Sequence, residues 1–140
     1  MNQNFILAFI LLVAFSVTNA TQFQLCKPQN PLPVPTVTFN PDPLAVNQDT
    51  TFHISGTLDT DIYGLSIILE DQSLQQIDFA PYDVDPPAPA GTPFSFTADY
   101  KLDPSKTLPQ DYTISIYLFD VEVTAKACAL AFVGSCSSCL

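Results

Sequence analysis

The chain has 140 residues, and its 14 acidic residues against four basic ones give a formal net charge of −10 at pH 7. A length of this order suits one domain with a single hydrophobic core. The basic residues are four scattered lysines and no arginine. Without a basic patch, the chain is a poor partner for nucleic acid and for electrostatic docking onto anionic membranes.

A run of 13 mostly apolar residues, FILAFILLVAFSV, lies near the start of the chain. Its length is typical of a secretory signal peptide, because a membrane-spanning helix needs about 20 such residues. The small residues Thr18 and Ala20 fit the positions before a cleavage site, although no Lys or Arg precedes the run. We therefore expect residues 1–20 to be a signal peptide and residues 21–140 to be the exported domain; the alternative is an anchor or a buried helix.

Prolines, 13 against four glycines, divide the rest of the chain. Between the proline clusters, apolar residues recur with a period of two, which is typical of strands with one buried face. The segments with this pattern are TTFHISGTL, GLSIILE, FSFTADYKL and DYTISIYLF. A further segment, ACALAFV, is apolar on both faces, which is typical of a central or doubly covered strand. Weaker strands are expected at Phe23–Lys27, Val34–Asn40 and Gln76–Pro81.

About eight strands and no helical period predict an all-β fold, namely an antiparallel, immunoglobulin-like two-sheet β-sandwich of seven or eight strands. The chain has no Trp, and no pair of cysteines has the inter-sheet spacing of antibody domains. A true antibody-type domain is therefore disfavoured. The proline-rich stretch 81–93 is expected to be a long extended loop or a crossover between the sheets.

Four cysteines occur in the exported part, at Cys26, Cys128, Cys136 and Cys139. Export favours disulfides, and four cysteines allow three pairings. A bridge between Cys26 and Cys128 would close a loop of about 100 residues and contribute up to about 4–5 kcal/mol in the chain-entropy model. The C-S-S-C sequence in the tail, residues 135–140, favours a small local disulfide, with pairing between chains or attachment to a partner as the alternatives.

The residues that enzymes and metal sites need are few. His53 is the only histidine, it falls on a polar strand face, and no G-x-S-x-G sequence surrounds a serine. Asp59, Asp61, Asp83 and Asp85 have D-x-D spacing, but the chain lacks the loop sequence of a calcium site. We expect no catalytic residues, no metal and no cofactor.

The order of several segments resembles the ML (lipid-recognition) domain family, which includes the Niemann–Pick type C cholesterol carrier and fungal phosphatidylglycerol/phosphatidylinositol transfer proteins. The likeness covers about residues 23–134. It rests on an early Cys26 followed by VTFNPDPL, FHISGTLDTDIYG, AGTPFSFTADYKL, LPQDYTISIYLFD and KACALAFV. The sequence departs from the family at the central loop, PYDVDPPAPAGTP, which lacks the usual cysteines.

The resemblance implies a secreted or vacuolar monomer that binds lipid, a sterol or a phospholipid, in an apolar cavity between two sheets and transfers it with transient membrane contact. It also implies a Cys26–Cys128 disulfide. The alternative is an exported interaction or structural module with a packed core and no ligand. If the family function holds, the cavity is expected to be lined by Phe52, Ile54, Leu65, Ile67, Phe79, Phe94, Phe96, Tyr100, Tyr112, Ile114 and Ile116.

Overall fold

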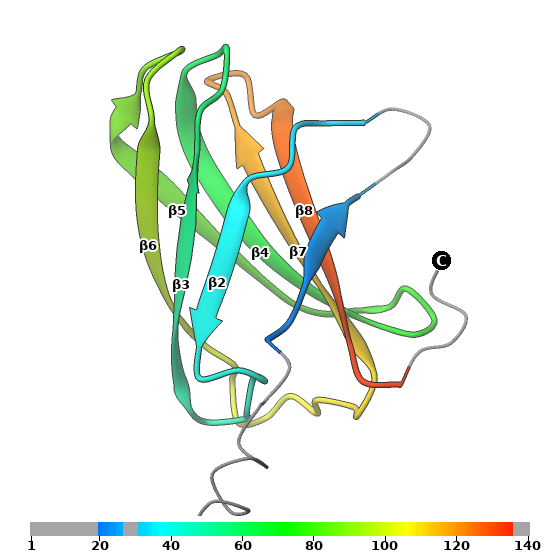
Figure 1. Ribbon diagram of the computed structural model, residues 1–140. Coiled ribbons are helices and arrows are strands. Elements are labelled where there is room, and N and C mark those ends of the chain that lie inside the picture. Colours follow the sequence, from blue (N-terminus) through cyan, green and yellow to red (C-terminus); the bar gives the residue numbers. More distant parts are fainter. Residues whose placement is uncertain (1–19, 27–30, 136–140) are drawn as a thin grey trace, which may run out of the picture.

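The computed structural model describes residues 20–26 and 31–135, so the expected signal peptide up to position 19 and the tail cysteines lie outside the described residues. The described part contains eight strands (Figure 1). They are β1 (Phe23–Leu25), β2 (Thr36–Asn40), β3 (Asp49–Gly56), β4 (Ile62–Asp71), β5 (Gln76–Ala88), β6 (Phe94–Lys101), β7 (Tyr112–Phe119) and β8 (Ala125–Val133).

The strands form two antiparallel sheets that lie face to face as two layers (Figure 1). The larger sheet has five strands in the order β1-β8-β7-β4-β5, and the smaller has three in the order β2-β3-β6. The predicted all-β, immunoglobulin-like two-sheet sandwich is thus confirmed. No helix of the described residues is long and apolar enough to cross a membrane.

Alternation of side chains explains why each layer turns one apolar face toward the interior. In β6, Phe94, Ala98 and Tyr100 are buried, whereas Ser95 and Asp99 between them are exposed. Strand β3 pairs with β6 along its whole length, so that Phe52 stands opposite Ala98. The inward faces of both sheets together make one hydrophobic core.

Strand β5 is longer than the sequence suggested. The predicted strand ended at Pro81, with a loop beyond it, but the observed strand continues to Ala88. Strand β5 is an edge strand of its sheet, and an edge strand tolerates prolines because one side of it needs no ladder hydrogen bonds. Within the stretch, Tyr82 and Val84 pack against the core, while Asp83 between them is exposed.

Strand β8 lies between β1 and β7, as its two apolar faces predicted. Leu25 of β1 stands opposite Ala129 of β8, so Cys26 comes next to Cys128, and these two cysteines form a disulfide. The pairing that the ML resemblance implies is therefore present. It joins two neighbouring strands of one sheet, which differs from the inter-sheet bridge of antibody domains. The backbone N–H of Cys128 also donates to the Pro33 carbonyl oxygen, at 3.0 Å.

Candidate functional site

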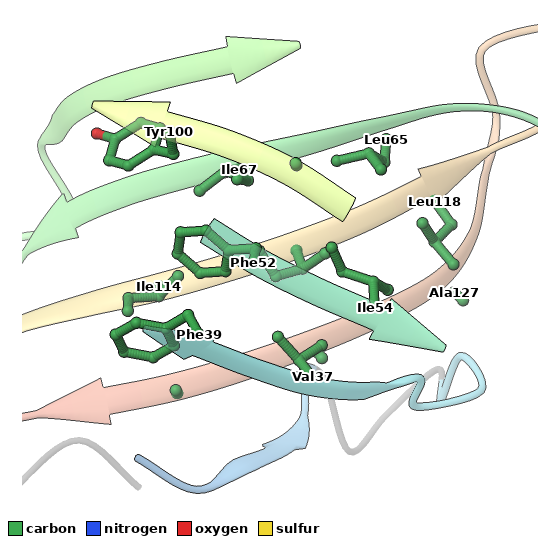
Figure 2. Close-up of a cluster of buried hydrophobic side chains, with 14 of the residues drawn as sticks. Val37, Phe39, Phe52, Ile54, Leu65, Ile67, Tyr100, Ile114, Leu118 and Ala127 are labelled. Carbon is green, nitrogen blue, oxygen red and sulfur yellow. The ribbon is translucent and has the colours of Figure 1, made fainter. Parts of the chain in front are cut away.

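The candidate site is the apolar interior between the two sheets. Figure 2 shows side chains from β2 and β3 beside those of β4 and β7, with Phe52 near the middle of the cluster. Phe52, Ile54 and Ile67 have no exposed surface. A continuous apolar interior between two sheets is an environment that suits a long hydrocarbon chain.

Aromatic rings occupy much of this interior. The Phe52 ring stacks on Phe39 with ring centroids 5.0 Å apart, and it meets Tyr100 edge-on at 6.0 Å. Phe94 and Phe96 stack at 4.8 Å. Offset and edge-on ring pairs are favourable by about 0.5–1.5 kcal/mol beyond the area that they bury. The interior is therefore lined by rings that pack on one another.

Two tyrosine hydroxyls tie the sheets together along the edges of β5 and β6. The Tyr100 hydroxyl donates to the Asp78 carboxylate at 2.8 Å, and the Tyr82 hydroxyl donates to the Asp99 carbonyl oxygen at 2.9 Å. Burial, followed by the hydrogen bond to Asp78, raises the pKa of Tyr100 far above its usual value. Burial and the nearby Asp99 likewise raise the pKa of Tyr82. Both groups are neutral donors at physiological pH.

A third buried tyrosine lies on β7. Tyr112 is 5% exposed, and burial raises the pKa of its hydroxyl to about 12. At the edge of the sandwich formed by β1 and β2, the ring of Phe23 meets that of Phe39 edge-on, with centroids 6.3 Å apart. The backbone N–H and the hydroxyl of Thr21 both donate to the Asp42 carboxylate, each at 2.6 Å.

The structure brings together ten of the 11 residues expected to line a cavity. Nine are buried in the core, and Phe96 is half-buried against it. Phe79 differs, because it is 48% exposed. Its strand pairs with β4 so that Phe79 stands opposite Ile68, while Asp78 and Ala80 stand opposite the buried Leu69 and Ile67. Phe79 therefore lies on the outer face of the five-stranded sheet.

The sequence-based prediction of the lining also omitted some residues that belong to this interior. Phe39 is one, although its alternation with Val37 in VTF gave the signal. Asp78 and Tyr82 are others. The alternation in PYDVD would have placed Tyr82 inward if the prolines had not favoured a loop. His53, expected on a polar face, is exposed, and its Nδ1 lies 3.5 Å from the Thr97 hydroxyl.

The described residues also form hollows at the molecular surface. Four of these have volumes of about 310, 470, 400 and 600 Å³, and none of the four is lined by Phe52, Ile54 or Ile67. The described part of the chain contains no group of three His, Cys, Asp or Glu residues placed to hold a metal ion.

Comparison with known proteins bears on the fold. No family model matches the chain, and no curated protein matches it significantly. Among solved structures, chicken MD-1 complexed with lipid IVa is similar, with a TM-score of 0.54 and 15% sequence identity, over 80% of this chain and 87% of that chain. At this identity the likeness concerns the fold alone, and it supports the ML-like sandwich that the sequence resemblance implies.

Proposed function

We propose that this protein binds a lipid between its two sheets. The observation that carries the proposal is the single apolar interior made by the inward faces of both sheets, with Phe52, Ile54 and Ile67 fully buried in it. Chicken MD-1 was crystallised as a complex with lipid IVa, so a protein of similar fold accommodates lipid. A bound acyl chain gains about 0.8 kcal/mol for each buried CH₂ group.

Entry of a lipid requires the sheets to separate locally. Hydrogen-bonded strand pairs occur within each sheet, so the layers are joined mainly by side chains. Along β5 and β6, the hydroxyl bonds of Tyr100 and Tyr82 join the two layers. We infer that lipid enters along this edge, where Asp78 and the two hydroxyls are then free to bond the polar end of a sterol or phospholipid. Such a ligand leaves its hydrocarbon part among the inward rings.

The proposal also covers the export of the protein, its location and its transfer of lipid. We propose that residues 1–20 are removed on export and that residues 21–140 act as a secreted or vacuolar monomer. In this role the protein would transfer a sterol or phospholipid and contact membranes only transiently, since its net charge of −10 disfavours lasting attachment to anionic lipid. Binding needs no catalytic residue.

The close ring stacking of Phe39 on Phe52 favours the alternative function, an exported interaction module with a packed core and no ligand. The two functions differ in what the interior contains when the protein is isolated. A carrier retains lipid or takes it up on exposure, whereas a packed module does neither.

Native mass spectrometry of the protein isolated from its source, with extraction and identification of bound lipid, tests the proposal. We expect a lipid adduct at one copy per chain, or uptake of a fluorescent sterol or phospholipid by the emptied protein. If neither is detected, the carrier function is wrong and the packed module is favoured.

A pair of neighbouring substitutions tests the position of the lipid. Ala129 of β8 is fully buried and stands opposite Ile116, so Ala129→Phe adds bulk to the interior. Leu130→Phe adds a similar ring one residue away on the other face of the sheet. We expect Ala129→Phe to reduce bound lipid several-fold and Leu130→Phe to leave it unchanged. Overpacking of this kind costs about 1–3 kcal/mol, so thermal unfolding is measured alongside.

A further inference from the structure

The outer face of the five-stranded sheet carries a hollow that the proposed lipid site does not use. Its volume is about 600 Å³, which lies in the range of small-molecule sites. The register between β4 and β5 shifts here, because a step of two residues from Ile62 to Gly64 faces a step of five from Asp83 to Ala88 on β5, and Tyr63 is exposed beside Gly64. Gly64 stands between Asp83 of β5 and Phe119 of β7, and its missing side chain leaves the space open.

Ser66 lines this hollow, and its hydroxyl makes no hydrogen bond within the described residues. Its side chain is 1% exposed, and its Oγ has no hydrogen-bond partner among the described residues. Its neighbours across the strands are Pro81 and Tyr117. A buried hydroxyl without a partner is costly, and a ligand that hydrogen-bonds to it removes that cost.

The walls of the hollow are aromatic and aliphatic. Tyr63 and Phe79 are 39% and 48% exposed, and Phe119 stacks on Tyr117 at 6.2 Å. These rings offer a place for an apolar ligand body and, through their faces, attract a cation. Surface aromatics in such number on one side of a sheet are otherwise unfavourable in water.

The loop between β7 and β8 forms one rim of the hollow. The Asp120 carboxylate accepts the backbone N–H groups of Glu122 and Thr124, at 3.0 and 2.9 Å, and so fixes the loop. Val123 is held at a φ of 59°, a backbone conformation that is unfavourable for a β-branched residue. Val121 and Val123 are left 67% and 76% exposed at the hollow.

The charge at the hollow is negative. Asp83 and Asp85 line it, both are exposed, and neither has an ion pair among the described residues. Asp120 also lines it, but its carboxylate lies 3.0 Å from the Lys126 ammonium. An anionic ligand would be repelled here, whereas a cation meets two carboxylates that have no basic partner in the described part of the chain.

We propose that this hollow binds an organic ammonium ion with an apolar body. The ligand's hydrocarbon or ring packs on Phe79 and Phe119, its charge lies beside Asp83 and Asp85, and an N–H group donates to Ser66 Oγ. Because that oxygen lies below the surface, the half-exposed side chains above it turn aside as the ligand enters. The site lies on the opposite face of the sheet from the proposed lipid interior and is independent of it.

Chemical-shift mapping by NMR with 2-phenylethylammonium as the probe tests this proposal. We expect saturable shifts at the hollow, with no comparable binding of 2-phenylethanol or 3-phenylpropionate, which keep the ring and replace the cation by a neutral or an anionic group. Equal binding of 2-phenylethanol, or the absence of shifts at the hollow, would overturn the proposal. So would binding of a lysine-rich aromatic peptide there without binding of the amine.

Two double variants of equal net charge distinguish attraction of the amine by the carboxylates at the hollow from attraction by the overall negative charge of the protein. The double variant Asp83→Asn/Asp85→Asn should weaken binding of the amine about tenfold, because it removes the two carboxylates at the hollow. The double variant Asp49→Asn/Asp59→Asn removes two exposed carboxylates that do not line the hollow, and it should change binding little. An equal loss in both would overturn the assignment.

Two further variants test the floor of the hollow. Gly64→Leu should abolish binding by filling the space, since a Cβ at this position lies at an ordinary 3.4 Å from the nearest atom, the Tyr82 carbonyl oxygen. Ser66→Ala should weaken binding at least about threefold. It should also leave the unliganded protein as stable as before or more so, because the buried hydroxyl has no partner to lose. Unchanged binding in both variants would contradict the proposal.

Discussion

At the scale of single residues, the buried tyrosines place polar, titratable hydroxyl groups in the core. Tyr100 and Tyr112 are 4% and 5% exposed, so each brings a hydroxyl into an apolar interior. Tyr100 satisfies its hydroxyl on Asp78. A buried hydroxyl and carboxylate bonded to each other are far less costly than either alone, which is why Asp78 tolerates an inward position.

These tyrosines predict a loss of stability at alkaline pH. In the unfolded chain a tyrosine has its ordinary pKa of 10.0, whereas burial raises the pKa of Tyr112 to about 12 in the fold. Between these values only the unfolded chain releases the proton, so the free energy of unfolding falls as the pH rises from about 10 to about 12. Below pH 10 this contribution is constant and fully present.

Urea unfolding measured between pH 8 and pH 12 checks this expectation. Tyr112→Phe removes the titrating group, so its free energy of unfolding should decline less steeply than that of the wild type above pH 10. Tyr100→Phe should act in the same direction, since burial raises the pKa of Tyr100 further. Parallel declines in all three proteins would show that other groups govern the alkaline transition.

At the scale of elements, the sequence predicted which strands exist better than how they pair. The alternation in FSFTADYKL and DYTISIYLF placed Tyr100, Ile114 and Ile116 inward, because a period of two fixes the face of a strand locally. Which strands pair with one another, by contrast, depends on contacts between residues that lie far apart in the sequence. Whether Phe79 or Asp78 faces inward depends on the register between β5 and β4, including the bulge between Leu69 and Glu70.

Strand β1 depends on its disulfide. It is three residues long and pairs with β8 alone, and besides this ladder and the contact of Phe23 with Phe39, the Cys26–Cys128 bridge fastens its end to β8. The double variant Cys26→Ser/Cys128→Ser should lower the free energy of unfolding by about 2–5 kcal/mol. Denaturant unfolding gives the loss, and hydrogen exchange should show the amides of β1 losing protection first.

The double variant Cys136→Ser/Cys139→Ser provides the control, because it changes the two tail cysteines and leaves the Cys26–Cys128 pair intact. A similar loss of stability in both variants would mean that the Cys26–Cys128 bridge has no special part in holding β1.

At the scale of the whole molecule, the charge of −10 is a source of self-repulsion. Only two ion pairs, Lys101 with Asp49 and Lys126 with Asp120, occur in the described part of the chain. Acidic groups are spread over both sheets and the loops, so folding brings like charges closer than in the extended chain. The hydrophobic core must offset this repulsion.

Added salt should therefore stabilise the protein. The Debye length falls to about 3 Å at 1 M salt from about 30 Å at 0.01 M, so repulsion between the surface carboxylates is screened. We expect the thermal midpoint to rise by a few degrees between 10 mM and 500 mM NaCl, because screening lowers the cost of holding the charges together. A fourfold variant, with Asn in place of Asp49, Asp59, Asp83 and Asp85, should show a smaller rise. A falling midpoint would instead show that the ion pairs outweigh the repulsion.

The prolines of β5 have a consequence for how this protein behaves at high concentration. An open sheet edge presents unpaired N–H and C=O groups that recruit strands from other molecules and start aggregation. One edge of the five-stranded sheet is the three-residue β1, and the other is β5, which carries Pro81, Pro86 and Pro87. A proline has no N–H to offer an incoming strand. The larger sheet thus resists the addition of further strands at either of its edges.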